Sequence, residues 1–411
     1  RHARWPAGQG RRQARVNFGA VLALAVTLVI QAMVAMALLT LPVMAPVVGQ
    51  ALSVSPALVG VYVSVTYAGA MTASLLGGDT VRRLGAIRVS QWGLLLCACG
   101  LLLCTLPWLP AIALGAVLIG LGYGPITPAS SHVLARTTPP QQMSLVFSIK
   151  QTGVPVGSML AGAIVPPLLL GIDWQASLAV VALVCVVCAL LAQPLRRELD
   201  ADRDASHPVH LGSLVRPIRL VLAHRSLSTM AACSFMFSMV QMSLTTYLVT
   251  YLNQELAFGL VAAGLALSAA QMGGIGGRIA WGWVADRGLG ASRTLMLLAA
   301  LMVCSALATA SLSPGTPHAL LVPVLVVFGA SAIGWNGVYL AEVARRAPAG
   351  QASLATGGTL AFTFLGVVIG PPVFGLLATV FGTYRAGFVA LMGVASLCGL
   401  LLFRLRRTQP V

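Results

Sequence analysis

Two cationic side chains lie inside otherwise apolar stretches of the sequence. Lys150 is nine residues beyond Gln141, where its stretch begins, and Arg278 is eight residues before Asp286. In helices, these separations correspond to roughly 10–13 Å of rise from the nearer end. An ionisable group at such depth in a membrane is costly and indicates a functional site. Because neither cation has a carboxylate at equal depth in the sequence, we expect the pair to hold a small organic or inorganic anion.

Polar side chains on the same and on other apolar stretches are candidates to complete this anion site. The candidates are Gln151, Gln271, Tyr123, Thr127, Gln241, Tyr247, Asn336 and Tyr339. Each could instead form a hydrogen bond between helices, which is the commoner use of such a residue. Arg278 could likewise be tied to Asp286 or Glu342, and Lys150 could extend toward the membrane surface.

The composition predicts the elements that must position these residues. Of the 411 residues, 58% are hydrophobic and 8% are charged, and the mean hydropathy is +0.91. Since an ordinary soluble domain carries roughly 25% charged residues, the sequence predicts a polytopic membrane protein. Its apolar runs are continuous and about 20 residues long, which favours helices over alternating barrel strands.

The fold class that we predict is an all-α membrane protein with twelve transmembrane helices in two pseudo-symmetric six-helix bundles. The twelve segments lie near 17–43, 56–78, 87–106, 110–135, 141–170, 174–195, 226–252, 259–284, 292–312, 318–344, 352–381 and 385–404. The predicted organisation is a tail at 1–16, a bundle at 17–195, a linker at 196–225, a bundle at 226–404 and a tail at 405–411. An internal repeat supports the two bundles, because 133–145 aligns with 342–354 at a fixed offset.

The basic residues predict the topology. When the two termini and every second loop are assigned to one side, that side holds 22 of the 25 basic residues. Such a bias places both termini in the cytoplasm, and we expect a bacterial inner membrane. The net charge of +16 then reflects topology, and we expect no nucleic-acid partner.

Two short turns carry glycine together with arginine. They lie at 76–89, LGGDTVRRLGAIRV, and at 282–293, GWVADRGLGASR. They resemble the G-x-x-x-D-R-x-G signature of the major facilitator superfamily. The positions that fit are Gly78, Arg83, Gly85, Gly282, Asp286, Arg287 and Arg293. In the first copy, Arg82 stands at the aspartate position.

A second family motif, G-x-x-x-G-P, is similar to Gly366, Gly370 and Pro371, with a partial copy at Gly153, Pro155 and Gly157. The resemblance implies that these six residues serve helix packing and that the two turns form a conformational latch. In the latch, Gly282 would allow another helix to approach closely, and Asp286 would accept hydrogen bonds from a helix N-terminus. Arg278 also resembles an anion-binding arginine of the monocarboxylate- and cyanate-type branches, four residues before the turn glycine.

The resemblance implies a secondary active transporter that works by alternating access, and the two cations suggest a small organic anion as its substrate. The alternatives are an efflux pump for hydrophobic or cationic compounds and a non-transporting sensor of the same fold. We expect no enzyme activity, no metal and no cofactor, since the six histidines are scattered and no catalytic cluster is evident. The expected partners are the substrate and the lipid bilayer around a monomer. A coupling proton or counter-ion is left open.

Overall fold

The computed structural model describes residues 7–138, 143–207, 215–349 and 351–407, and within them it contains helices and no strand. The first nine helices are α1 (Ala7–Val43), α2 (Ala45–Leu52), α3 (Val59–Leu84), α4 (Ala86–Leu103), α5 (Leu109–Tyr123), α6 (Ile126–Thr137), α7 (Met143–Gln151), α8 (Gly153–Leu168) and α9 (Trp174–Leu191), with the 3-10 turn η1 (Pro56–Leu58) before α3. The linker contains η3 (Gln193–Leu195), α10 (Arg196–Leu199) and α11 (Val215–Ala223). The last elements are α12 (Arg225–Gln254), α13 (Leu260–Val284), the π-turn η4 (Ala285–Leu289), α14 (Ala291–Ala310), α15 (His318–Gly334), α16 (Asn336–Arg346), α17 (Ala352–Phe381) and α18 (Tyr384–Arg407).

These helices form a multi-pass membrane protein, which confirms the predicted fold class. Among the described residues, eleven helical stretches are long and apolar enough to cross a membrane. The remaining predicted span, 141–170, is divided into α7 and α8 by a break at Thr152. Three predicted spans are thus pairs of helices, namely α5–α6, α7–α8 and α15–α16.

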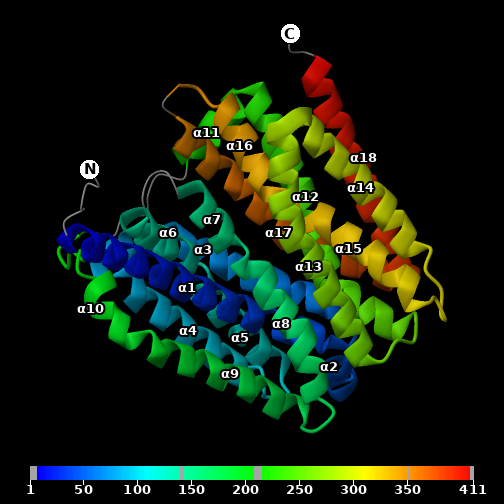
Figure 1. Cartoon of the computed structure of the whole chain (residues 1–411). Coiled ribbons are helices and arrows are strands. Elements are labelled where there is room, and N and C mark those ends of the chain that lie inside the picture. The colour runs from blue at the N-terminus through cyan, green and yellow to red at the C-terminus, as the bar shows by residue number, and fades with distance from the viewer. Residues whose placement is uncertain (1–6, 139–142, 208–214, 350, 408–411) are drawn as a thin grey trace.

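The helices gather into two bundles that lie side by side (Figure 1). Helices α1 to α9 pack mainly with one another, and so do α12 to α18, while α8 packs on α13 and α3 on α17 across the interface. The turns after α3 and η4 repeat one backbone conformation. Gly85 has φ 96° and Gly290 has φ 74°, and each precedes the next helix directly. Only glycine adopts this conformation without strain, which explains both glycines.

Glycines bring the helices of each bundle into close contact. A Cβ atom at Gly157 or Gly366 would lie less than 3.0 Å from a backbone carbonyl oxygen, that of Ala32 on α1 or of Phe235 on α12. Gly153 and Gly370 are similarly close to Gln31 and Met239. These contacts agree with the helix packing that the family motif implies.

The first part of the linker is bound to the first bundle. The carboxylate of Asp200 accepts hydrogen bonds from the backbone N–H groups of Ile87 (2.7 Å) and Arg88 (3.0 Å) at the start of α4. Its side chain is only 3% exposed, and this burial raises the pKa of the Asp200 carboxyl above its ordinary value of 3.8. The Asp200 side chain packs against Gly85. This is the turn in which Arg82 replaces the aspartate of the family motif.

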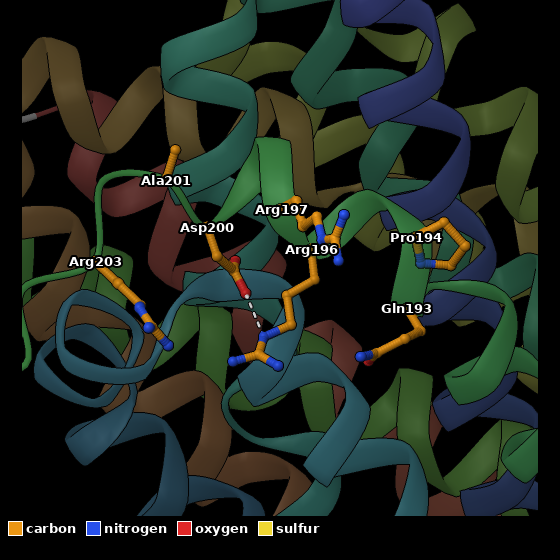
Figure 2. A pocket seen from close by; sticks show the side chains of 7 residues that line it. All are labelled: Gln193, Pro194, Arg196, Arg197, Asp200, Ala201 and Arg203. Carbon is orange, nitrogen blue, oxygen red and sulfur yellow. Dashed lines mark ion pairs between the residues drawn. The ribbon is translucent and has the colours of Figure 1, made fainter.

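Further polar contacts extend this attachment. Asp202 forms an ion pair with Arg136 of α6 and lies 2.6 Å from the Nε2 of His132, and His207 lies 3.0 Å from Asp79 of α3. Figure 2 shows the adjoining surface hollow, where Asp200 faces Arg196 and where Arg197 and Arg203 also contribute. The carboxylate in this hollow, that of Asp200, already caps the start of α4. We therefore assign the hollow to the attachment of the linker and not to ligand binding.

The second part of the linker belongs to the second bundle. Helix α11 packs on α17 and α12, its Val221 is fully buried, and Ser228 of α12 donates a hydrogen bond to the carbonyl of Val221 at 2.9 Å. Arg216 and Arg219 are exposed on the other face. Helix α11 is therefore amphipathic, with its apolar face packed on the second bundle.

Candidate functional site

Lys150 is the last-but-one residue of α7 and is almost completely enclosed. Its side chain is 1% exposed, and its Nζ has no hydrogen-bond partner among the described residues. Arg278 is close enough for the two cations to repel each other. Burying an ammonium without a counter-charge costs on the order of several kcal/mol. An anion between the two cations would remove this cost.

Arg278 joins the two bundles through backbone carbonyls. Its Nη1 donates to the carbonyl of Gln151 at 2.6 Å, and its Nε donates to that of Ile333 at 3.2 Å. The carbonyl of Gln151 is free because the residue four positions later is Pro155, which has no N–H group. Neither Asp286 nor Glu342 forms a hydrogen bond or ion pair with Arg278. The alternative in which one of these carboxylates binds Arg278 is therefore not the arrangement observed.

Glu342 has its own partners. Its carboxylate is fully buried and pairs with Arg345 and Arg346, and it also accepts a hydrogen bond from Ser292. The charge of this carboxylate is therefore balanced locally on α16.

A small cavity lies between the bundles, and neither Lys150 nor Arg278 is among the residues that line it. Side chains of both bundles line it, and they include the predicted residues Tyr123, Gln241 and Gln271. Ile333, whose carbonyl binds Arg278, also lines it. With a volume of about 20 Å³ the cavity has room for roughly one water molecule. The bundles must therefore separate further before an organic molecule can enter.

Polar contacts orient the residues of this cavity. The amide oxygen of Gln241 accepts from Trp335 at 2.9 Å and lies 3.5 Å from the Asn336 amide nitrogen. Gln271 donates to Thr245 at 3.3 Å. Tyr339 is buried edge-on against Trp335. The predicted residues Gln241, Gln271, Asn336 and Tyr339 of α12, α13 and α16 are thus connected through Thr245 and Trp335.

Tyr247 lies elsewhere. Its hydroxyl donates to the carbonyl of Ala57 at 2.7 Å and is 3.0 Å from that of Pro371, while its ring stacks on Phe374. These contacts join the bundles at the end opposite to the chain termini, so its hydroxyl is not available to a ligand in this conformation.

The sequence analysis missed Gln31. This residue of α1 is fully buried, and its Nε2 has no partner in the described part of the chain. Its Oε1 is 3.4 Å from the hydroxyl of Thr127, and its side chain lies against Gly153, one turn from Lys150. Gln31 is the one glutamine in the apolar stretch 17–43 and lies in its middle, which is the signal that could have found it.

Three predicted spans contain a helix break. The breaks lie at Gly124–Pro125, at Thr152 and at Trp335. Interrupted helices expose backbone groups that can bind ligands near the middle of a transporter. Here, two of these breaks supply the carbonyls that hold Arg278.

The latch that the family motif implies is not assembled in this structure. Apart from the glycine's own chain neighbours and helix backbone, no atom of the described residues lies within 4 Å of a Cβ placed at Gly78 or Gly282. Asp286 is exposed and makes no hydrogen bond or ion pair with another described residue. Arg287 instead lies over the ring of Trp283, 5.1 Å from its centroid. The expected close approach is absent because no helix of the other bundle reaches these glycines.

Comparisons with known proteins agree with the fold. The family model described as the Major Facilitator Superfamily matches residues 23–362. A chloroplast sodium-dependent phosphate transport protein of Arabidopsis thaliana is 27% identical over 250 residues, which cover 56% of this chain and 48% of that protein. The match therefore spans about half the length of this relative. The hexuronate transporter of Bacillus subtilis is 23% identical over 312 residues, 71% of this chain and 72% of its own.

A solved structure of the nucleoside transporter NupG superposes with a TM-score of 0.78 at 15% identity, and the match covers 93% of this chain and 99% of that one. At this identity the similarity concerns the fold alone. The extent of the family match, together with the two bundles and their repeated glycine turns, shows that the chain belongs to the Major Facilitator Superfamily.

Proposed function

We propose that the protein is a secondary active transporter for a small organic anion. The observation that carries this proposal is the enclosed Lys150, which has no described partner and lies beside Arg278 at the interface of the bundles. A carboxylate or similar anion would supply the missing charge and the missing hydrogen-bond acceptor. The relatives named for phosphate and hexuronate transport are consistent with an anionic substrate.

The bundles at 17–195 and 226–404 would alternate between two arrangements. Hydrogen bonds join them at the far end from the termini, where Ser64 donates to the carbonyl of Val368 and Ser268 to that of Met159. The unassembled latch lies at the termini end. With both termini in the cytoplasm of a bacterial inner membrane, this conformation is the one that faces inward, and a monomer suffices for the cycle.

The two alternatives are less well supported. A site for cations would need a carboxylate in the interface, and the residues that line the described cavity include none. A non-transporting sensor would bind the anion without moving it, and a flux measurement separates the two.

The test begins with purified protein in detergent. D-Glucuronate, L-lactate, sulfate and phosphate are compared with cationic drugs for their effect on the melting temperature. A ligand at a hundredfold excess over its Kd stabilises the native state by about 2.7 kcal/mol. We expect at least one anion to raise the melting temperature and to enter proteoliposomes. Stabilisation by the cationic drugs alone would contradict the proposal.

The variant Lys150→Gln probes the site directly. Because it removes the charge and keeps a polar side chain, it should abolish anion uptake while folded protein remains in the membrane. The control is Arg197→Gln, which removes an exposed cation of the linker and should leave uptake unchanged. Equal uptake by wild-type protein and Lys150→Gln would refute the role of Lys150.

A further inference from the structure

Three hydroxyl groups on α12 are buried without a hydrogen-bond partner in the part of the chain that the structure describes. They belong to Ser243, Thr246 and Thr250, whose side chains are at most 1% exposed. A hydroxyl inside a helix can bond to the carbonyl four positions earlier, as those of Thr229 and Thr245 do on the same helix. Because an unsatisfied buried hydroxyl is unfavourable, three of them together indicate a partner that binds in another conformation.

The three side chains follow one face of α12, and we call them the hydroxyl stripe. Residues three, four and seven positions apart share a helix face. Met242, four positions before Thr246, lines the small cavity between the bundles. Asn253, three positions after Thr250, lines a larger hollow. Since α12 also contacts α1, α2 and α3, the stripe runs between two hollows along the interface with the first bundle.

The larger hollow lies between the bundles at the end that contains α2, opposite to the chain termini (Figure 1). It has a volume of about 530 Å³. Gln50 and Ser53 line it from the first bundle, and Asn253 and Gln254 line it from the second. None of the described residues that line it is charged. Its polar groups are thus amides and a hydroxyl, which recognise hydroxyl groups of a ligand through hydrogen bonds.

We propose that the hydroxyl stripe binds hydroxyl groups of the substrate, and that the substrate is therefore a polyhydroxylated carboxylate such as a sugar acid. This inference rests on the proposed function and adds the substrate class to it. When the bundles separate at the end opposite to the termini, the stripe forms one wall of the opening between the larger hollow and the small cavity. The substrate's hydroxyl groups then bind Ser243, Thr246 and Thr250, and its carboxylate continues to Lys150 and Arg278.

The length and chemistry of the stripe favour this substrate class over simple carboxylates. From Ser243 to Thr250 the stripe extends about 10 Å along the helix, so it can contact several hydroxyl groups of one molecule. A carboxylate without hydroxyl groups would leave the three side chains unsatisfied once water is excluded. Sites built to bind a hydroxyl group reject analogues that lack it for this reason.

The experiment compares two carboxylates that share a six-membered ring and differ in their hydroxyl groups. Proteoliposomes take up labelled D-glucuronate, and unlabelled cyclohexanecarboxylate competes with it. The wild-type protein should bind cyclohexanecarboxylate at least about tenfold more weakly. Thr246→Val and Thr250→Val each remove one hydroxyl and should raise the KM for D-glucuronate about fivefold, which corresponds to one hydrogen bond.

Matched variants separate substrate binding from stability. Thr229→Val removes a hydroxyl that bonds to the carbonyl of Arg225 near the other end of α12, and it should keep the wild-type KM. Thr246→Ser and Thr250→Ser retain the hydroxyl and should also keep it. Without ligand, the two valine variants of the stripe should melt no lower than the wild type, because they bury no unsatisfied hydroxyl.

The results that overturn the proposal differ from those that overturn the proposed function. The hydroxyl stripe has no role in binding if both of its valine variants keep the wild-type KM, or if the serine variants lose as much as the valine variants. Equal binding of the two carboxylates by the wild type contradicts the substrate class. If L-lactate, sulfate or phosphate is transported while D-glucuronate and D-gluconate are not, this inference is wrong and the proposed function stands. If no anion is transported, both fail.

Discussion

Pro155 helps to hold Arg278 in place through the backbone of its helix. Pro155 lacks an N–H group, so the carbonyl of Gln151 has no helical partner and accepts from Arg278 instead. At the next position the helical pattern resumes, since the N–H of Val156 bonds to the carbonyl of Thr152. The proline of the packing motif therefore also helps to position Arg278 in the proposed anion site.

Replacing this proline should weaken the site. In Pro155→Ala, a new N–H group competes with Arg278 for the carbonyl of Gln151, at a cost of about 1 kcal/mol, or roughly fivefold in affinity. Anion titrations that follow the melting temperature measure the effect. Pro167→Ala is the matched control, because Pro167 is an exposed proline of the same helix. Equal affinities in the two variants would contradict this role of Pro155.

The sequence predicted that Lys150 and Arg278 are deep in their spans, because depth can be counted along a helix. Lys150 and Arg278 are similarly deep, and the structure brings them together. Gln31 was not identified, because a single glutamine within an apolar stretch forms no spacing pattern with other polar residues. Nor could the sequence place Tyr247, whose contacts with two carbonyls depend on how the bundles meet.

At the scale of elements, glycines determine how closely helices approach. Gly157→Ala would place a Cβ atom against the backbone of α1, which cannot move without disturbing its own hydrogen bonds. Such overpacking costs about 1–3 kcal/mol, so the melting temperature should fall. Gly276→Ala is the control, because a Cβ atom there meets open space within α13. Similar melting temperatures for the two variants would disprove the packing role.

Asp200 links the linker to α4 and gives this contact a dependence on pH. Burial raises the pKa of the Asp200 carboxyl in the folded protein. At pH values between 3.8 and this raised pKa, the folded protein therefore binds the Asp200 proton more tightly than the unfolded chain does. By linkage, stability from this group is lost as the pH rises through that window. Asp200→Asn keeps an acceptor for the N–H of Ile87 and has no charge to bury.

We therefore expect the stability of Asp200→Asn relative to wild type to increase as the pH is raised from about 4 to the raised pKa. Asp200→Ala, which leaves the N–H groups of Ile87 and Arg88 without their acceptor, should be less stable than Asp200→Asn by about 1 kcal/mol. Melting temperatures across this pH range provide the measurement. A relative stability that decreases with pH would show that the charge of Asp200 is favourable instead.

At the scale of the whole molecule, Tyr247 helps to keep the far end closed. Tyr247→Phe removes a hydrogen bond between the bundles worth about 1 kcal/mol, which should shift the equilibrium toward separation there roughly fivefold. Tyr251→Phe is the control, because Tyr251 donates at 2.7 Å to Thr309 within the second bundle. Hydrogen exchange of residues 56–64 should accelerate in the first variant alone. If hydrogen exchange accelerates equally in both variants, a lower overall stability of the protein, and not separation of the two bundles, is the cause.

The overall architecture was predictable because long apolar stretches and repeated motifs are visible in the sequence. The twelve spans follow from hydropathy, although the breaks at Thr152 and Trp335 within them do not. The attachment of Asp200 to α4 could not be predicted, since it joins residues more than 100 positions apart through backbone groups.

The divided linker has a consequence for engineering. Its first part, through His207, is attached to the first bundle, and α11 is attached to the second. Each bundle thus already carries the segment that covers its own surface. A chain cut between 207 and 215 leaves both attachments intact, so two co-expressed fragments should associate in the membrane and restore the two-bundle fold.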